Sequence, residues 1–345
     1  SMNAINSSIE WKGWGGDKMS MAGADVLKHY SELAFMGFWE VFKNLKTIKA
    51  NFKSCKEQIN KFQPDAVILI DYPGFNLRMA KFIAKKNIKV FYYISPQLWA
   101  WNASRVKVVR SYVDAMAVIL PFEKEFYKER KVDVEYVGHP LLDAVNSFIK
   151  EESFREKNDL DERKIIALVP GSRKQEISKI LPTMVGVSSS FPDYQFVIGG
   201  ILRQRELYES FLNKQVKVIY DDTYQLLSHS KAAVVASGTA TLETALFNVP
   251  MVVCYKASAI SVFIAKQLAK VKYISLVNLI LDREAVKELI QQDFNSQELQ
   301  LHLEGLLINK GLRADLKKEY LDLKEKLGNE GASNRAANYF LNALK

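Results

Sequence analysis

The chain has 345 residues, of which 48% are hydrophobic and 25% charged, and these values exclude a disordered chain and favour two folded domains. Lys and Arg number 48 and Asp and Glu 39, so the net charge is +9, which favours partners that carry phosphate without saying which. The two cysteines, Cys55 and Cys254, lack metal-ligand spacing, and no signal peptide or run of about 18 apolar residues is visible. We therefore expect a protein of a reducing cytoplasm.

The first clear pattern along the chain is an amphipathic helix. Its apolar positions recur at steps of three and four residues, with lysines beside them. The apolar positions are Phe38, Phe42, Leu45, Ile48, Phe52, Cys55 and Ile59, and the lysines are Lys43, Lys46, Lys49, Lys53 and Lys56. Most such helices bury the apolar face in their own core. Aromatic residues beside lysines are also typical of a helix on an anionic membrane, so both interpretations stay open here.

Short apolar runs alternate with helical stretches over most of the chain. The runs lie at residues 65–71, 89–94, 115–120, 164–169, 195–198, 216–219, 232–236 and 250–255. Continuous apolar runs are typical of parallel strands covered on both faces, and the helices between them indicate βαβ units. The predicted fold class is therefore α/β. The charged stretch 148–163 predicts a boundary between two Rossmann-like domains, and residues 283–345 show a helical pattern without strands.

In the first predicted domain, candidate chemistry follows two neighbouring strands. Asp71 ends a strand, where a carboxylate is well placed as a general base, although Asp before a Pro-Gly pair is also a common turn residue. Residues 95–101 contain Trp99 and Trp101, which either shape an acceptor pocket or pack the domain. His139 is interpreted as a structural histidine.

In the second predicted domain, glycine-bearing turns follow three strands, at residues 170–173, 199–200 and 237–239. Glycine lets the backbone approach a phosphate, and the next helix points its N–H groups at the anion. The hydroxyl residues Ser237, Thr239 and Thr241 also suit helix N-caps, so capping alone is the competing interpretation of each turn. Three such turns in one domain favour a diphosphate site.

Glu243 lies one turn into the helix that follows the last of these turns. Its carboxylate is placed either to accept both hydroxyls of a ribose or to remain solvated at a helix start. The sequence has no Walker, HExxH or Ser/His/Asp spacing motif.

Several segments together resemble the lipid-A-disaccharide synthases, glycosyltransferases of the lipopolysaccharide pathway. The matching segments are 36–41 (MGFWEV), 70–76 (IDYPGFN), 93–101 (YISPQLWAW), 120–123 (LPFE), 137–140 (VGHP), 169–177 (VPGSRKQEI), 236–243 (ASGTATLE) and 273–280 (YISLVNLI). They cover nearly the whole chain, and SPxxWAW followed by SGTATLE is a specific pair. The resemblance implies the GT-B fold, with a cleft between two Rossmann-like domains.

The resemblance also implies a reaction. UDP-2,3-diacylglucosamine is the donor, 2,3-diacylglucosamine 1-phosphate is the acceptor, and the products are the β-1,6-linked lipid A disaccharide 1-phosphate and UDP. The configuration inverts, so one displacement suffices, and no covalent enzyme nucleophile, cofactor or metal is expected. By resemblance, Asp71 takes the proton of the acceptor hydroxyl and Arg173 stabilises the departing diphosphate.

The remaining site residues are implied in the same way. The expected donor contacts are Gly171, Ser172, Ser237, Gly238, Thr239, Ala240, Glu243, Asn278 and Gln291. The expected acceptor or membrane contacts are Phe38, Trp39, Phe42, Asn76, Ser95, Trp99 and Trp101. Because both substrates are lipids, we expect a cytoplasmic protein bound peripherally to the anionic inner face of the inner membrane. A homodimer is allowed, and nucleic acid is not expected as a partner.

The resemblance implies a division into domains, and the chain differs from the family pattern at two places. Residues 1–155 are the predicted acceptor and membrane domain, 156–325 the UDP-sugar domain, and 326–345 a helix that packs back across the domains or onto a partner subunit. The family begins with a strand, a GExSGD turn and a helix, and the first β-α unit is expected to be absent here. The family often has a second acid after the base, where this chain has Gly74.

Two alternatives come from other classes. One is a different GT-B enzyme that uses UDP-N-acetylglucosamine, such as a lipid II synthase-like enzyme or a 2-epimerase. The other is a non-catalytic, truncated nucleotide-sugar-binding protein or membrane scaffold.

Overall fold

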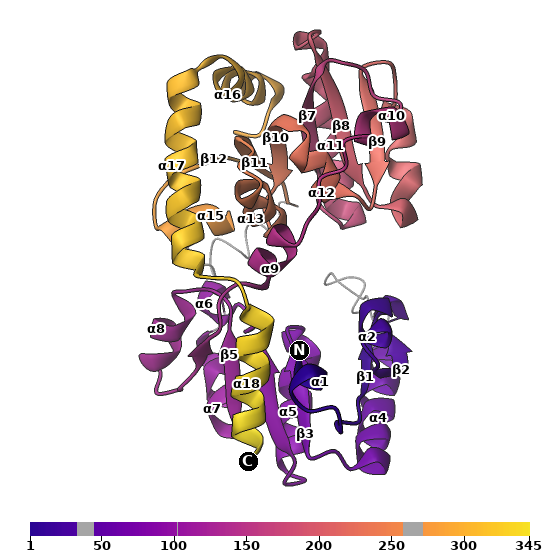
Figure 1. Cartoon of the computed structure of the whole chain (residues 1–345), viewed down its shortest axis with the longest axis vertical. Helices are drawn as coiled ribbons and strands as arrows, with labels where there is room; N and C mark the ends of the chain where they lie inside the picture. Colours follow the sequence, from indigo (N-terminus) through magenta and orange to yellow (C-terminus); the bar gives the residue numbers. More distant parts are fainter. Residues whose placement is uncertain (33–44, 102, 258–271) are drawn as a thin grey trace.

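The computed structural model describes residues 1–32, 45–101, 103–257 and 272–345 and arranges them in two lobes (Figure 1). The lobes are joined by the segment after α9 (Pro140–Asn146) and by the segment between α17 (Lys310–Leu327) and α18 (Ala332–Leu344). All strand pairs in the described residues are parallel. Each of the eight strands predicted from the sequence is present, so the α/β fold class is confirmed.

The N-terminal lobe contains a four-stranded sheet of order β3-β4-β5-β6 and a separate pair, β1-β2. The strands are β1 (Lys12–Gly15), β2 (Asp25–His29), β3 (Ala66–Ile70), β4 (Lys89–Tyr93), β5 (Ala115–Val118) and β6 (Glu135–Tyr136). The helices are α1 (Met2–Ile5), α2 (Asp17–Met21), α4 (Leu45–Phe62), α5 (Pro73–Ala84), α6 (Leu98–Trp101), α7 (Val106–Tyr112), α8 (Glu123–Lys128) and α9 (Pro140–Asn146), with 3-10 turns η1 (Tyr30–Glu32) and η2 (Ala103–Arg105).

The C-terminal lobe contains a six-stranded sheet of order β12-β11-β10-β7-β8-β9. The strands are β7 (Lys164–Val169), β8 (Tyr194–Gly200), β9 (Val216–Tyr220), β10 (Ser230–Ala236), β11 (Met251–Tyr255) and β12 (Lys287–Ile290). The helices are α10 (Phe154–Lys157), α11 (Lys174–Gly186), α12 (Thr223–Ser228), α13 (Thr239–Leu246), α15 (Leu276–Leu281), α16 (Ser296–Ile308) and α17 (Lys310–Leu327), with 3-10 turns η3 (Ser188–Ser190), η4 (Leu202–Leu207) and η5 (Glu209–Phe211).

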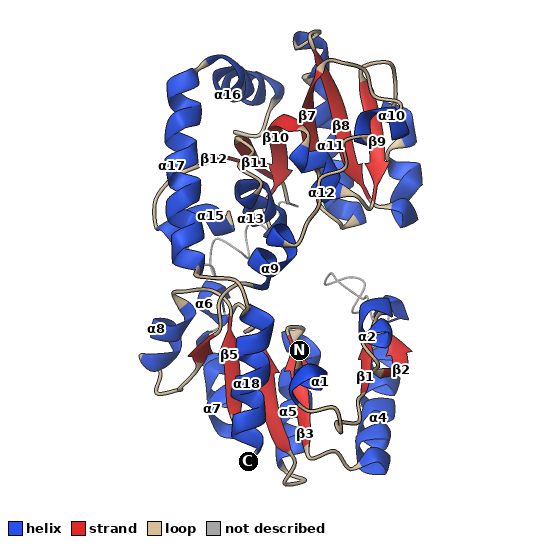
Figure 2. Ribbon diagram, viewed as in Figure 1, coloured by secondary structure: helices blue, strands red, loops and turns tan. Residues whose placement is uncertain are grey.

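The order of the six strands decides where a ligand can bind. Read from the β9 edge, the order is β9-β8-β7-β10-β11-β12. If β7 is numbered as the first strand, this is the order 3-2-1-4-5-6 of the Rossmann fold. The direction of strand addition reverses between β7 and β10, and such a reversal opens a crevice at the carboxyl ends of the two strands. Strands β7, β10 and β11 are buried along most of their length because helices surround the sheet (Figure 2).

The described part of the amphipathic helix, α4, packs against its own lobe. Phe52, Cys55 and Ile59 contact the core of the N-terminal lobe, and the Phe52 ring stacks on Phe75 at 4.3 Å between centroids. The core interpretation therefore holds for these residues. Phe38, Trp39 and Phe42 lie outside the described residues. In the part of the chain that the structure describes, no helix is both long and apolar enough to span a bilayer.

One edge strand differs from the expectations, and another ends in an exposed residue. Strand β12 lies in residues 283–345, which were predicted to be without strands, and this prediction is wrong. The sequence pattern does not mark this strand. It is four residues long, starts with Lys287 and Glu288 and occupies a sheet edge, so it lacks an apolar run. At the other lobe, β3 pairs with β4 on one side only among the described strands, and its last residue, Ile70, is 47% exposed.

The C-terminal helix returns the chain to the N-terminal lobe. Helix α18 (Ala332–Leu344) packs on β4 and β5, where the ring of Phe340 stacks on Phe91 at 5.2 Å between centroids. The guanidinium of Arg335 donates to the backbone carbonyl of Val137 at 2.8 Å. The chain therefore crosses between the lobes twice, and α18 closes the N-terminal lobe.

Candidate active site

Two of the predicted glycine turns lie side by side at the reversal point of the C-terminal sheet. One follows β7 at Gly171, and the other follows β10 at Ser237 and Gly238. Because β7 and β10 are hydrogen-bonded neighbours, the two turns share one edge of the sheet. The third predicted turn is wrong, since residues 199–200 are the buried end of strand β8. A Cβ on Gly200 would lie 2.8 Å from Val218, so that glycine serves packing.

The turn after β7 needs glycine for two reasons. Gly171 has a φ of +92°, and a Cβ there would lie 2.3 Å from the carboxylate of Glu176. The helix that follows, α11, has Arg173 at its N-cap position with no side-chain cap, and the Arg173 guanidinium is exposed. Burial raises the pKa of Glu176, and the nearby Arg173 opposes this shift. Ser172 is exposed, and its backbone carbonyl accepts from the Gln204 side chain at 3.0 Å.

The turn after β10 leaves the start of α13 without a side-chain cap. The N-cap residue is Gly238, whose φ is +153°. The hydroxyl of Ser237 donates to the carbonyl of Ile274 at 2.7 Å, and that of Thr241 donates back to the carbonyl of Gly238 at 2.8 Å. Capping, the competing interpretation, is therefore wrong here. The helix start at the exposed Thr239 thus has no side-chain cap, an arrangement that suits an anion.

Beyond this turn, Glu243 is held by a tyrosine that the sequence did not suggest. The Tyr224 hydroxyl donates to Oε1 of Glu243 at 3.1 Å, and burial raises the pKa of that glutamate. The ring of Tyr224 packs edge to face against Phe148 in the segment between the lobes. No motif marks Tyr224, because its role depends on α12 and α13 lying together. Ala240, between the turn and Glu243, is partly buried against the core.

The structure contradicts the predicted contact between the Asn278 side chain and the nucleotide. Its side chain is fully buried, and its Oδ1 accepts from the backbone N–H groups of Ala285 and Val286 at 2.8 and 2.9 Å. Its Nδ2 donates to the Val286 carbonyl at 2.8 Å and to Glu288 at 2.9 Å. Every hydrogen-bonding position of the amide is thus used to hold the chain between α15 and β12.

Gln291 also bonds to the backbone. Its Oε1 accepts from the N–H of Ala257 at 2.6 Å, and its Nε2 lies 3.4 Å from the Ala257 carbonyl. Gln291 therefore anchors the chain after β11, at the sheet edge where the glycine turns lie, rather than presenting a free amide.

Asp71 lies in a turn that residues other than glycine rarely form. Asp71 and Tyr72 have φ values of +43° and +44°, and both are in the left-handed region. The amide of Asn76 donates to the carbonyls of Ile70 and Asp71 at 2.9 and 2.7 Å, and the hydroxyl of Tyr92 donates to the Asp71 carbonyl at 2.5 Å. Partial burial raises the pKa of the Asp71 carboxyl, although the N–H of Tyr72 opposes the shift. Asn76 thus shapes the turn.

The residues predicted on the acceptor side differ in how they are placed. Ser95 is buried and its hydroxyl donates to the Pro96 carbonyl at 3.0 Å. Trp99 is half-buried, and its ring packs edge to face against Phe122, which follows β5 in the same lobe. The side chain of Trp101 lies outside the described residues. Sequence reasoning missed Glu123, which accepts a hydrogen bond from the Trp99 indole at 3.3 Å.

His139 has the structural role that its position suggested. It is buried, and its Nδ1 accepts from the N–H of Leu141 at 3.2 Å, which caps α9. Burial lowers the pKa of the imidazole to about 4, so the ring is neutral near pH 7.

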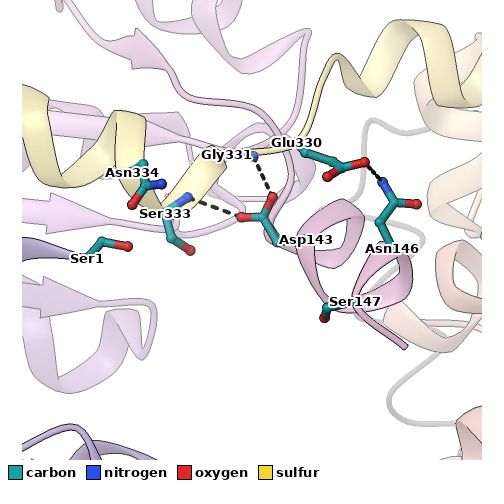
Figure 3. Close-up of a pocket in the computed structure, with 8 residues that line it drawn as sticks. All are labelled: Ser1, Asp143, Asn146, Ser147, Glu330, Gly331, Ser333 and Asn334. Atoms are coloured by element: carbon teal, nitrogen blue, oxygen red, sulfur yellow. Dashed lines mark hydrogen bonds between the residues drawn. The ribbon is translucent and has the colours of Figure 1, made fainter. Parts of the chain in front are cut away.

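A polar surface hollow lies at the joint between α9 and α18. Its lining residues are Ser1, Asp143, Asn146, Ser147, Glu330, Gly331, Ser333 and Asn334 (Figure 3). The carboxylate of Asp143 accepts from the N–H groups of Gly331 at 2.5 Å and Ser333 at 3.4 Å. Because these hydrogen bonds link α9 to the start of α18, we interpret the hollow as part of the structural contact between the two helices and not as a ligand site. Within the described ranges, no three His, Cys, Asp or Glu side chains gather as metal ligands.

The chain is similar to proteins of one enzyme family over its whole length. Residues 1–343 match the family model described as lipid-A-disaccharide synthetase. The lipid-A-disaccharide synthase of Coxiella burnetii (strain CbuG_Q212) is 36% identical over 350 residues, which cover 100% of this chain and 93% of that protein. The enzyme of the same name from Syntrophus aciditrophicus (strain SB) is 38% identical over 347 residues, covering 98% and 91%.

Solved structures with a similar fold include glycosyltransferases and nucleotide-sugar epimerases. The S. aureus MnaA-UDP co-structure has a TM-score of 0.64 at 13% identity and covers 86% of this chain and 82% of its own. The glycotransferase of kitacinnamycin has a TM-score of 0.62 at 12% identity, with coverage of 100% and 94%. UDP-GlcNAc 2-epimerase from Neisseria meningitidis bound to UDP-GlcNAc scores 0.60 at 16% identity, covering 94% and 87%. These likenesses concern the fold alone, which is GT-B.

Proposed function

Because the chain belongs to the lipid-A-disaccharide synthetase family, we propose that it transfers 2,3-diacylglucosamine from UDP to 2,3-diacylglucosamine 1-phosphate. The chain is a glycosyltransferase of lipid A biosynthesis, as the family and its named relatives show. The proposal adds the two substrates, the inverting course of the reaction and the residues that carry it.

One observation supports the donor site above all others, namely the pair of turns at the strand reversal of the C-terminal sheet. The turns at Gly171 and Gly238 place two helix starts, α11 and α13, at adjacent strand ends. Neither N-cap residue makes a side-chain cap, but the Glu176 carboxyl accepts hydrogen bonds from the backbone of Ser172 and Arg173, so the turn after β10 is the better source of backbone N–H groups for the diphosphate of UDP. Glu243, held by Tyr224, lies one helical turn further on, where it accepts the hydroxyls of the ribose.

On the acceptor side, Asp71 is the proposed general base. It stands at the carboxyl end of β3, at the same edge of the sheet as the segments that follow the next strands, β4 and β5. Its partly buried carboxyl has a raised pKa, which makes the carboxylate a stronger base than an ordinary aspartate. Asn76 and Tyr92 bond to the backbone of the turn and leave the Asp71 side chain free to take the proton of the sugar hydroxyl.

The departing UDP carries the negative charge that develops during transfer. The exposed guanidinium of Arg173 and the N–H groups that start α11 and α13 are the proposed stabilising groups, so the reaction needs no metal. Because the acceptor oxygen displaces UDP directly, the anomeric configuration inverts and no bond to the enzyme forms.

The test is an assay with both acylated glucosamines and with the UDP-sugar alone. We expect disaccharide 1-phosphate and UDP in equal amounts when both substrates are present, without added metal and in the presence of a chelator. Conversion of the UDP-sugar without an acceptor would instead identify an epimerase. Binding of the UDP-sugar with no turnover at any metal concentration would identify a non-catalytic binding protein.

We also propose that the segment with Phe38, Trp39 and Phe42 contacts an anionic membrane, since both substrates carry acyl chains. The charge pattern supports this placement, because Lys46, Lys49 and Lys53 are exposed on α4, which follows that segment in the chain.

Flotation with liposomes that contain anionic lipid tests the membrane contact. Changing Phe38, Trp39 and Phe42 to serine is expected to reduce liposome binding about tenfold or more. A matched control changes the exposed Leu301, Ile308 and Leu321 of the other lobe to serine and is expected to leave binding unchanged. Equal binding by both variants would contradict the proposal.

A further inference from the structure

The carboxylate of Glu123 is buried at the end of β5 without a cationic partner. Its side chain belongs to a residue that is 1% exposed. Its Oε2 accepts from the backbone N–H groups of Ile119 at 3.2 Å and Leu120 at 2.9 Å. Its Oε1 accepts from the Trp99 indole N–H at 3.3 Å. The Ser95 side chain also bonds to this carboxyl, so all four hydrogen-bond partners are neutral and lie on two different strand ends.

Both lysines of α8 pair with other carboxylates. Lys124 lies 3.5 Å from Glu135, and Lys128 lies 3.8 Å from Glu125. In the described residues no salt bridge to Glu123 forms. Burial raises the pKa of the Glu123 carboxyl to about 7, and the N–H groups of Leu120 and Ile119 oppose this shift. An apolar side chain of similar size would avoid this desolvation, so stability alone does not account for a glutamate at this position.

Glu123 bonds to a segment that we call the acceptor platform, defined as residues Ser95–Trp99. Helix α8 and the residue before it contact the platform at three points. The first is the bond from Trp99 to Glu123, and the second is the edge-to-face contact of the Trp99 and Phe122 rings at 4.9 Å and 87°. The third joins the hydroxyls of Ser95 and Tyr127 at 2.8 Å.

The platform is also linked to the proposed base. Tyr92, on the strand that leads into the platform, donates its hydroxyl to the carbonyl of Asp71 at 2.5 Å. The segments after β3, β4 and β5 are thus tied together by hydrogen bonds from buried side chains. Distortion of the segment after β5 is therefore transmitted to the platform beside Asp71.

We propose that Glu123 is a positioning residue for the acceptor sugar, because it joins the Trp99 indole to the turn after β5 and so sets the shape of the acceptor platform. This inference rests on the proposed function. Glu123 does not touch the substrate. Its effect is expected on acceptor binding and not on donor binding, because the donor turns lie on the other lobe.

Steady-state kinetics of Glu123→Gln against Glu125→Gln tests the inference. Both changes neutralise a glutamate of the same helix, but Glu125 has an exposed side chain that bonds only at the surface. Glutamine keeps the size of Glu123 but replaces one accepting oxygen with an amide that cannot accept. We expect Glu123→Gln to raise the acceptor KM about tenfold and to leave the donor KM within about twofold, as for the loss of one or two hydrogen bonds to a charged group. Glu125→Gln is expected to match the wild type.

Trp99→Phe provides a second variant that keeps an aromatic ring and removes only the indole donor. It is expected to raise the acceptor KM selectively as well, and the double variant should cost less than the product of the two single effects, because both break the same link. If Glu123→Gln does not melt cooperatively, Tyr127→Phe, which removes the hydrogen bond between this helix and Ser95, provides the second test through the acceptor KM.

Two results would overturn the inference. One is a wild-type acceptor KM in folded Glu123→Gln and Trp99→Phe, and the other is an equal rise of both KM values. In both cases the wild type is active and only the role of Glu123 is refuted. A wild-type chain that transfers no sugar would refute the proposed function itself.

Discussion

The turns that carry the two proposed sites present polar groups by opposite means. In the C-terminal lobe, the turns after β7 and β10 use Gly171 and Gly238, whose φ values of +92° and +153° cost a glycine little. In the N-terminal lobe, the turns after β3 and β4 place Asp71, Tyr72 and Ile94 at φ values between +43° and +61°. Ile94 is β-branched, so this conformation is especially strained for it.

The difference matches what each lobe has to present. A glycine turn exposes backbone N–H groups and has no side chain in the way, which suits a diphosphate. A turn at Asp71 keeps a carboxylate at the strand end, which suits proton transfer, and the strain there is held by hydrogen bonds from Asn76 and Tyr92. A pre-organised backbone is thus the feature of the two donor turns, and a pre-organised side chain is the feature of the turn at Asp71.

The largest effect is expected where the side chain itself does the chemistry. Asp71→Asn retains the shape of the turn but removes the base, so transfer should fall at least about a hundredfold, within the range of general-base catalysis. The wild-type rate should fall as the pH drops through the raised pKa of Asp71, because only the carboxylate accepts a proton. Rate measurements across pH check both points. A near-normal rate, or an acidic limb that persists in Asp71→Asn, would exclude Asp71 as the base.

A loss of that size or smaller is expected from Arg173, the cationic residue at the N-cap position of α11. Arg173→Ala should reduce the transfer rate about a hundredfold, since an exposed guanidinium that stabilises a leaving diphosphate acts in the transition state. The same lobe offers Arg205→Ala as a control, because Arg205 pairs with Glu209 at the surface. Equal rates for the two variants would remove Arg173 from the mechanism.

The glycine half of the comparison is tested by adding one methyl group to each lobe. Gly171→Ala meets a positive φ and the carboxylate of Glu176, so the free energy of unfolding should drop by about 1–3 kcal/mol and UDP binding should weaken. Gly74→Ala meets no atom within 4 Å and lies in α5, so it should be neutral or stabilise the fold by about 0.4–1 kcal/mol. Denaturant unfolding and UDP titration measure both variants, and equal destabilisation would erase the contrast.

The smallest effect is expected from the hydrogen bonds that hold the strained turn. Asn76→Ala removes the donor to the carbonyls of Ile70 and Asp71, and the transfer rate should fall about tenfold, as for one or two lost hydrogen bonds. The UDP affinity should not change, because this turn belongs to the other lobe. Isothermal titration with UDP beside the rate assay separates the two effects, and a loss of UDP affinity would show that the lobes are not independent.

Much of this arrangement could be predicted along the chain. Apolar runs indicated the parallel strands, and the residues just after them indicated the turns at Asp71, Gly171 and Gly238, because strand ends are local features. Strand β12 could not be recognised, since a four-residue edge strand that begins with two charged residues carries no apolar pattern. The turn assigned to residues 199–200 was wrong because a glycine pair marks close packing as readily as a turn.

The sequence by itself determined the fold class, the strand ends that carry chemistry and the resemblance to one family, because these depend on neighbours along the chain. Only the tertiary structure decided what each polar side chain does. Asn278 is saturated by backbone from the α15–β12 connection, and Tyr224 and Glu123 gained partners on other elements. Hydrogen bonds between buried groups require a donor and an acceptor about 3 Å apart, and no spacing along a chain specifies that for residues brought together by folding.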